Sequence, residues 1–374
     1  YVSSVLAYNA RYQVTSSQQT IPGVFGTDVL AGDWKFQASF NEAGQQLSVS
    51  TPTGPVDSVT PAVWPTFDVA TTGYNGLGAP DRLWQGATST PVDGSVYVYN
   101  SVFDELGRVN RRTLSQSNVT GGAALRRAYT YDTNTGALSR IRAGWTTIPN
   151  APTAYFQDET LTRDAIGNVT QIADNGLEPA GGASGVKECF IYDPHNRLVR
   201  AHSAATATGC VTTTTAASVA AGSVDAYDQV WTFDDINRMK SRTNKLTAVA
   251  TNYTYTGTKH AVTGTTGGTA ASFGYNAVGA MTSRAGTTLG YDALQRLTSY
   301  GSSESYLYST SNQRLIRTAG TTRTLYLPGV EVTDTAGVLT LTRFVSIAGT
   351  QVATKTTTST GTSLAWNCAS PQNS

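Results

Sequence analysis

Short stretches of alternating side chains recur along the chain and predict β-strands. In V-Y-V-Y-N-S-V-F, the side chains of Tyr97, Tyr99, Ser101 and Phe103 share one face, and Asn100 lies on the other face with the three valines. The same two-residue spacing of aromatic side chains returns at Tyr129/Tyr131, Tyr253/Tyr255 and Tyr306/Tyr308. No stretch shows a convincing helical period, so the pattern predicts an all-β chain.

A short signature follows many of these predicted strands. It consists of an aromatic residue, Asp or Asn, two variable residues, Gly or Asn, often Arg, and an aliphatic residue. The clearest copies begin at Phe103 (F-D-E-L-G-R-V), Tyr192 (Y-D-P-H-N-R-L), Phe233 (F-D-D-I-N-R-M), Tyr275 (Y-N-A-V-G-A-M) and Tyr291 (Y-D-A-L-Q-R-L). Looser copies begin at Phe40, Tyr74, Tyr131, Arg163 and Tyr308. About ten copies in one chain indicate a repeat protein.

The chemistry of one copy predicts a β-hairpin. Asp104 can accept a hydrogen bond from a backbone N–H two residues later and so start a turn. Gly107 suits a positive φ, and Asn196 and Asn237, the next best tolerated residue type, replace it in two other copies. Arg108 then begins the returning strand.

A lone hairpin is marginal in water, so we expect the copies to pair edge to edge in one sheet. The recurring aromatic rings can then form ladders with arginines stacked on them, each contact contributing roughly 0.2–1 kcal/mol. The residues assigned to the repeat turns are Phe103, Asp104, Gly107, Arg108, Tyr192, Asp193, Asn196, Arg197, Phe233, Asp234, Asn237, Arg238, Tyr291, Asp292 and Arg296.

Composition and charge agree with this prediction and exclude several classes of protein. The chain has 374 residues, 14% charged residues, 19 tyrosines and 36 glycines. This composition favours strands and tight turns over helices. The net charge of +1 argues against nucleic acid as the main partner. No apolar run approaches the roughly 20 residues of a membrane span.

These motifs resemble the RHS-repeat (YD-repeat) family, from about residue 30 to residue 374. The second half carries the most specific matches, including Y-T-Y-T-G-T-K-H-A-V-T-G from Tyr253 and T-L-Y-L-P-G-V-E-V from Thr324. The resemblance implies a continuous spiral antiparallel β-sheet of stacked YD-repeat hairpins, forming a partial or complete hollow shell. In this family the shell belongs to large secreted or surface proteins, among them polymorphic toxins, Tc toxin complexes and teneurins. In the toxins it encloses a C-terminal effector segment.

The organisation along the chain follows from the distribution of copies. Residues 1–30 contain no clear copy and are predicted to be an N-terminal cap or incomplete repeat, followed by the repeat sheet over 31–374 with its core at 250–374. Residues 50–66, with four prolines, are predicted to form a loop, and 174–186 and 203–224 to be long mobile insertions. The self-cleaving Asp-Pro-x-Gly motif of toxin-bearing members is not found in the sequence. We therefore expect a truncated or processed piece of shell.

Two of the three cysteines could be linked. Cys189 and Cys210 lie 21 positions apart, and in an oxidising compartment a disulfide between them would stabilise the fold by about 3 kcal/mol. The alternative is two buried thiols in a cytosolic protein. The Ala/Thr-rich segment between them favours the disulfide, and the pair resembles one in some secreted bacterial members of the family. Cys368 has no obvious partner.

Other chemistry in the sequence has simpler structural explanations. The repeat Asp residues are explained as turn formers, and neither a metal site nor a cofactor site is expected. The expected function is therefore non-enzymatic: a secreted or cell-surface scaffold that encloses or displays a polypeptide cargo, in contact with that cargo or with neighbouring repeats. One alternative is an adhesin or filament that self-associates through strand edges or binds glycans, with Trp64, Trp84 and Trp145 to be tested first. The other is an unrecognised hydrolase.

Overall fold

The structure is a computed structural model that describes most of the chain. The described residues are 1–23, 29–52, 67–176, 185–205, 208–220 and 226–368. Most of the loop predicted at 50–66 and much of the insertion predicted at 174–186 lie outside them. Within the described residues the chain is all-β: 29 strands belong to one antiparallel sheet, and none of these residues is helical. Accordingly, no described helix could span a membrane.

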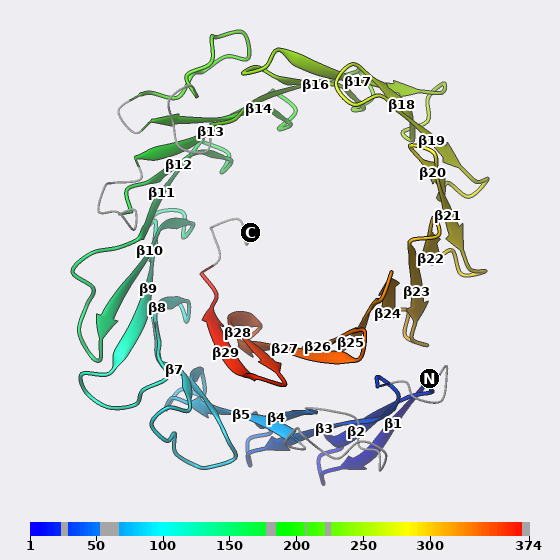
Figure 1. Ribbon diagram of the computed structural model, residues 1–374. Coiled ribbons are helices and arrows are strands. Elements are labelled where there is room, and N and C mark those ends of the chain that lie inside the picture. Colours follow the sequence, from blue (N-terminus) through cyan, green and yellow to red (C-terminus); the bar gives the residue numbers. More distant parts are fainter. Residues whose placement is uncertain (24–28, 53–66, 177–184, 206–207, 221–225, 369–374) are drawn as a thin grey trace. The chain divides into compact units, whose positions relative to one another are not determined.

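Consecutive strands pair antiparallel, so the sheet is built from hairpins in chain order, as the repeats predict (Figure 1). By its contacts the chain divides into two compact units. Unit 1 comprises Tyr1–Arg126, Trp145–Ala151 and Ser302–Ser374, and unit 2 comprises Arg127–Gly144 and Pro152–Gly301. Strands β9 (Ala123–Tyr131) and β10 (Leu138–Thr147) contain residues of both units.

Unit 1 contains the first and the last strands of the chain. Its first strands are β1 (Val2–Tyr8), β2 (Val14–Ile21), β3 (Gly32–Phe40), β4 (Gln46–Pro52), β5 (Phe67–Tyr74), β6 (Pro80–Gln85), β7 (Val96–Phe103) and β8 (Val109–Leu114). Its last strands are β23 (Glu304–Tyr308), β24 (Arg314–Ala319), β25 (Thr322–Leu327), β26 (Val330–Thr335), β27 (Val338–Ile347), β28 (Thr350–Thr358) and β29 (Gly361–Trp366).

The two groups of strands in unit 1 face each other and enclose a hydrophobic core. Figure 1 shows β25–β29 (orange to red) beside β1–β5 (blue). Ile21, Leu30 and the fully buried Trp34 come from the N-terminal side. The C-terminal side contributes Leu315, Ile316, Leu325, Leu327, Val330, Val332 and Leu341. Unit 1 is therefore two-layered, which the repeat pattern alone does not indicate. Burial of these side chains from both sides supplies the main hydrophobic stabilisation of the unit.

Unit 2 is built from the middle strands. They are β11 (Gln157–Arg163), β12 (Val169–Asp174), β13 (Val186–Tyr192), β14 (Leu198–Ala205), β15 (Asp228–Phe233), β16 (Met239–Asn244), β17 (Val249–Tyr255), β18 (Val262–Thr266), β19 (Ala271–Tyr275), β20 (Met281–Arg284), β21 (Thr287–Tyr291) and β22 (Leu297–Tyr300). Among the described residues from 228 to 301, no apolar side chain is fully buried. These strands therefore depend on backbone pairing and on contacts between neighbouring hairpins.

Candidate functional site

The repeat residues that the sequence predicts lie in the hairpin turns. In each turn the Asp side chain organises the backbone. Asp234 accepts hydrogen bonds at Oδ1 from the backbone N–H of Ile236 (3.1 Å) and of Arg238 (2.9 Å). Its Oδ2 accepts from Nε of Arg238 at 2.6 Å. The same three contacts join Asp104 to Leu106 and Arg108, Asp193 to His195 and Arg197, and Asp292 to Leu294 and Arg296. Each turn thus uses both oxygens of its carboxylate internally.

The fourth residue of each turn has a left-handed backbone. Gly107 has φ 75°, and Asn196 and Asn237 have φ 61° and 66°. In the last of these copies Gln295 takes the position with φ 59°, although Gln has no special tolerance for it. A type I turn followed by such a residue makes the three-residue hairpin loop with a bulge, and the register shifts beside each aromatic residue fit that geometry, for example between Thr232 and Phe233.

Successive hairpins of unit 2 are joined by the aromatic and arginine side chains of the repeat. The guanidinium of Arg197 lies over the ring of Phe233 in the next hairpin at 4.7 Å, and that of Arg238 over Tyr255 at 4.6 Å. In the opposite direction, the Tyr255 hydroxyl donates to the carbonyl oxygen of Met239 at 2.7 Å. The hydroxyls of Tyr192, Tyr275 and Tyr291 donate in the same way to Val169, Val262 and Met281. The repeat pattern predicts the stacked arginines but not these hydroxyl contacts.

The two adjacent carboxylates of one turn give a matched pair for mutation. We expect Asp234→Ala to lower the thermal unfolding midpoint clearly, because two backbone N–H groups and Arg238 lose their acceptor. Asp235→Ala removes an exposed carboxylate at the next position and should leave the midpoint almost unchanged. Melting curves of both variants at equal concentration check this; equal midpoints would show that the repeat Asp has no structural role.

One hairpin of the same kind lies in the segment where no repeat copy was recognised. Strands β1 and β2 are joined by a turn in which Asn9 Oδ1 accepts from the backbone N–H of Arg11 (2.9 Å) and of Gln13 (3.0 Å). Tyr12 occupies the left-handed position with φ 59°. The motif Y-N-A-R-Y-Q-V from Tyr8 was missed because a tyrosine stands where Gly or Asn is expected. The aromatic–Asn pair was the available signal.

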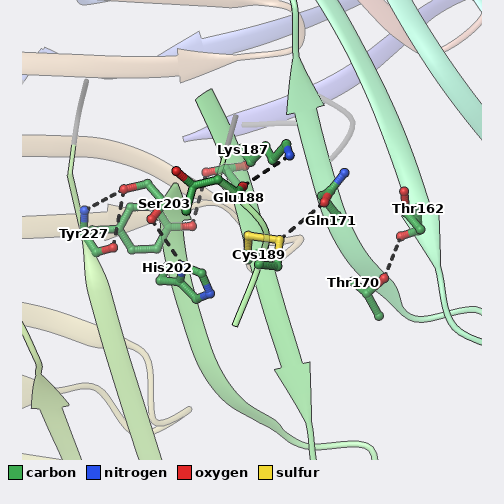
Figure 2. The surroundings of a disulfide bond; sticks show 11 residues. Thr162, Thr170, Gln171, Lys187, Glu188, Cys189, His202, Ser203 and Tyr227 are labelled. Carbon is green, nitrogen blue, oxygen red and sulfur yellow. Dashed lines mark hydrogen bonds between the residues drawn. A yellow bond between two sulfur atoms is a disulfide. The ribbon is translucent and has the colours of Figure 1, made fainter. Parts of the chain in front are cut away.

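In unit 2, Cys189 on β13 and Cys210 form a disulfide bond (Figure 2). Cys189 is fully buried. Nearby, Lys187 Nζ donates to the carbonyl oxygen of Thr208 at 3.3 Å. Residues 203–205 of the predicted 203–224 insertion belong to strand β14, and residues 208–220 are attached to the face of strands β13 and β14 instead of extending freely.

A buried ion pair attaches the same segment to the sheet at a second point. Arg200 and Asp228 have fully buried side chains, and Arg200 Nη2 lies 2.7 Å from Asp228 Oδ2. Arg200 Nη1 also donates to the carbonyl oxygens of Thr213 (2.9 Å) and Ala216 (3.0 Å). Burial raises the pKa of Asp228, but the hydrogen bonds from Arg200 and Ser218 outweigh it and keep this pKa below its usual value. The pair is ionised and fixes the path of residues 213–216 over the sheet.

His202 lies beneath this segment, beside the disulfide (Figure 2). Its ring is fully buried, and Nδ1 lies 3.2 Å from the carbonyl oxygen of Ser203. Burial lowers the pKa of His202, so the imidazole is neutral at pH 7. Thus the chemistry-bearing residues of this region act in packing: disulfide, ion pair and histidine all hold one loop to one sheet.

A further ion pair on β23 and β24 gives a pH-dependent prediction. Glu304 accepts two hydrogen bonds from Arg317 at 2.8 Å each and one from the Tyr306 hydroxyl at 2.6 Å, which lower its pKa from 4.5 to about 2. A carboxyl whose pKa is lowered by folding stabilises the fold above its unfolded pKa and loses that contribution as pH falls toward its folded pKa. We expect Glu304→Gln to melt below wild type at pH 7, and this gap to close between pH 4.5 and about 2.

Melting curves of both proteins over that pH range test the expectation. Glu105→Gln, at an exposed turn position, is the control and should follow wild type throughout. A gap that stayed constant with pH would mean that the side chain acts through shape and not through charge.

The residues that would serve the two alternative functions, glycan binding and hydrolysis, differ in their exposure and surroundings. Trp84 is only 5% exposed and donates from its indole N–H to the carbonyl oxygen of Thr88, whereas Trp145 is 61% exposed. Trp64 lies outside the described residues.

Glu159 on β11 lies directly opposite Asp174 on β12. Burial raises the pKa of Glu159, and repulsion from Asp174 and Glu188 raises it further. The described residues contain no cluster of three His, Cys, Asp or Glu side chains suited to a metal ion. Glycan binding and hydrolysis stay predictions.

Comparison with known proteins shows which solved structures share this fold. Neither a protein-family model nor a curated protein matches the chain. Solved structures do match. A Photorhabdus luminescens Tc holotoxin pore carrying the TccC3 mutation D651A aligns with a TM-score of 0.66 and 15% identity, covering 99% of this chain and 18% of that one. The TcdB2-TccC3 crystal structure gives 0.63, 15%, 99% and 19%, and the TcdB2-TccC3-Cdc42 structure gives 0.62, 15%, 99% and 18%.

The chain thus spans about a fifth of the length of the solved chains that it matches. At this level of identity the comparison establishes fold alone. Over nearly all of its length, the chain has the fold of part of these Tc toxin chains, in agreement with the fold that the RHS-repeat resemblance implies.

Proposed function

We propose that the chain is a non-enzymatic structural scaffold of a secreted or cell-surface protein, and that it encloses or displays a polypeptide such as a toxin segment. The observation that carries the proposal is that the charged side chains of the repeat bind to other groups of the same sheet. In the turn of Asp234, both carboxylate oxygens and the Arg238 guanidinium are engaged with the turn itself or with the next hairpin. Such a repeat is suited to building a wall, because the charged groups of this turn are used within the sheet.

Three further observations support the proposal. Solved structures with this fold include TcdB2-TccC3 and a Tc holotoxin pore. The disulfide between Cys189 and Cys210 is typical of proteins that leave the reducing cytosol. The hydrogen-bonded strands also protect one another, because each inner strand has both edges paired.

The test uses an unfolded reporter fused after Ser374, for example a Gly/Ser/Lys-rich segment of about 80 residues. The matched control carries the same reporter on an unrelated monomeric β-protein. We expect the reporter to survive trypsin at least about tenfold longer on this chain, because a scaffold that encloses a polypeptide restricts access to it. If the reporter is cleaved equally fast in both fusions, enclosure is wrong. Display instead leaves the reporter outside the sheet, so equal cleavage of the two fusions is the result that display predicts.

A further inference from the structure

A groove of about 870 Å³ lies over strands β3 to β6 of unit 1. Residues that stand directly opposite one another on neighbouring strands point to the same face of a sheet. The floor of the groove is one such row across the four strands, made of Ser39, Ser48, Thr71 and Trp84. Three of these four side chains are small, so the sheet is hollow here, and the hollow has the size of a ligand site.

The groove lies on the face of β5 that is turned away from the C-terminal strands. Successive side chains of a strand point to opposite faces, so Asp68 and Thr71 lie on different faces of β5. Asp68 contacts Arg343 of β27 and Lys355 of β28. The small side chains of the floor are therefore not required for packing between the two layers of unit 1.

The indole ring of Trp84 forms one wall of the groove, and Gly73 leaves room for it. A Cβ atom at position 73 would lie 3.1 Å from Cζ3 of this ring. The indole N–H donates to the carbonyl oxygen of Thr88 at 3.1 Å, which fixes the orientation of the ring. Because Trp84 is only 5% exposed, it offers a narrow apolar wall and not a broad stacking surface. The wall is held in place by the protein itself.

The groove is uncharged. Among the described residues that line it, every polar side chain is a hydroxyl or an amide, apart from the indole. Burial raises the pKa of Tyr74, which keeps this hydroxyl protonated at pH 7. A charged ligand would therefore lose water without gaining an ion pair, and the groove favours an uncharged ligand.

The hydroxyl groups of the groove mainly offer lone pairs to a ligand. The Thr71 hydroxyl donates its proton to the carbonyl oxygen of Gly86, and the Tyr74 hydroxyl donates to that of Gln46 at 2.8 Å. The hydroxyl oxygens of Ser39 and Ser48 lie 2.6 Å apart, so one of them donates to the other. A hydroxyl oxygen that has donated its proton still accepts hydrogen bonds. Such a surface is complementary to a ligand that carries many donors of its own.

We propose that this groove binds a neutral oligosaccharide. The ring of a neutral sugar carries several O–H donors for the oxygens of the floor, and its C–H groups can pack against an indole wall. It brings no charge into the groove. The inference goes beyond the proposed scaffold function and does not depend on it, because it concerns one face of β3 to β6 and not the polypeptide that the sheet holds.

An extended polypeptide fits the same groove less well. Strands β3, β4 and β5 are each paired on both edges, so a peptide cannot be added to them as a further strand. Its backbone then offers one N–H donor per residue, fewer than the hydroxyl groups of a sugar unit.

Saturation-transfer difference NMR on the full chain tests the proposal. The neutral probes are cellotetraose, maltotetraose and N-acetylchitotetraose. Sialyllactose is the charged probe, and a short uncharged Gly/Ser/Thr peptide represents a polypeptide. We expect transfer to at least one neutral oligosaccharide, and none to sialyllactose or to the peptide.

Three variants locate the binding. Ser48→Leu fills the floor of the groove and should abolish the transfer. The matched control is Ser241→Leu, because Ser241 stands opposite Thr232, with their hydroxyl oxygens 2.7 Å apart, in a hairpin of unit 2. This control should bind like wild type. Ser39→Ala combined with Ser48→Ala leaves the groove open and should weaken binding about fivefold, because hydrogen-bonding oxygens are lost from the floor.

Circular dichroism verifies that each variant is folded. Absence of transfer to all three neutral oligosaccharides overturns the proposal. Binding that survives Ser48→Leu, or that is lost equally in Ser241→Leu, contradicts the placement in this groove. Transfer to sialyllactose alone would show that the ligand is charged, and transfer to the peptide alone would show that the groove holds a polypeptide; either result overturns the proposal.

Discussion

Replacing Asp68 by Asn is expected to destabilise unit 1 by about 3–5 kcal/mol. The carboxylate of Asp68 on β5 is 8% exposed and lies between two cations from the far end of the chain. Arg343 Nη1 on β27 is 2.6 Å from Oδ1, and Lys355 Nζ on β28 is 2.7 Å from Oδ2. Asn keeps the shape but removes the charge, so two buried or half-buried cations lose their counter-ion. Next to them, the buried Tyr97 has a pKa raised by burial and cannot supply a compensating anion at pH 7.

Hydrogen exchange localises this effect. We expect the amides of residues 338–358, in β27 and β28, to exchange faster in Asp68→Asn, because these strands lose their link to β5. Peptides of unit 2 serve as an internal reference and should keep their wild-type rates. Glu105→Gln, an exposed charge change in the same unit, should cost less than about 0.5 kcal/mol. An Asp68→Asn protein with wild-type urea stability and wild-type exchange in β27 and β28 would show that the two layers do not depend on this cluster.

The second large effect is expected for Asp228→Asn in unit 2. The Arg200–Asp228 pair is fully buried, and loss of the negative charge leaves the Arg200 guanidinium facing neutral oxygens, namely the Asn amide oxygen and the carbonyl oxygens of Thr213, Ala216 and Ala217. Removing one member of such a pair typically costs about 3–5 kcal/mol. Because Asn has nearly the same shape as Asp, the variant again measures the effect of losing the charge alone. Asp235→Asn, at an exposed turn position two residues after the end of β15, is the matched control.

Coupling to the disulfide sharpens this test. Because Cys210 and Arg200 hold the same segment to the sheet, Cys210→Ser and Asp228→Asn should not act independently. We expect the double variant to be destabilised by an amount that differs from the sum of the single effects by about 0.5 kcal/mol or more. Exact additivity in urea unfolding, together with unchanged exchange over 208–220 in each single variant, would mean that the ion pair and the disulfide support separate parts of the unit.

The sequence predicts the hairpin well because the determinants of the turn are local. Asp104, Gly107 and Arg108 interact within five residues, so their order in the chain specifies their geometry. The same logic fails when one local determinant is replaced, and the hairpin around Asn9 was missed because Tyr12 adopts the left-handed backbone usually left to Gly or Asn.

Long-range features could not be predicted in the same way. Alternation along β27 shows which side chains share a face, but not that this face packs on β2 and β3 or that Arg343 reaches Asp68. Likewise, the Ala/Thr-rich composition of 203–224 predicts mobility. It does not show that Arg200 and Lys245, which lie outside this segment, donate hydrogen bonds to its carbonyl oxygens. Buried polar partners distant in sequence leave no periodic signal.

The central claim is that the described strands form one continuous sheet of hairpins whose turns are organised by Asp side chains. Hydrogen exchange of the intact chain, measured peptide by peptide, tests this claim most directly. We expect slow exchange in every inner strand from β2 to β28, interrupted at each repeat turn only by the few amides that face water. Protection confined to a few isolated islands, with the strands around Asp193, Asp234 and Asp292 exchanging as fast as an unfolded chain, would contradict the account.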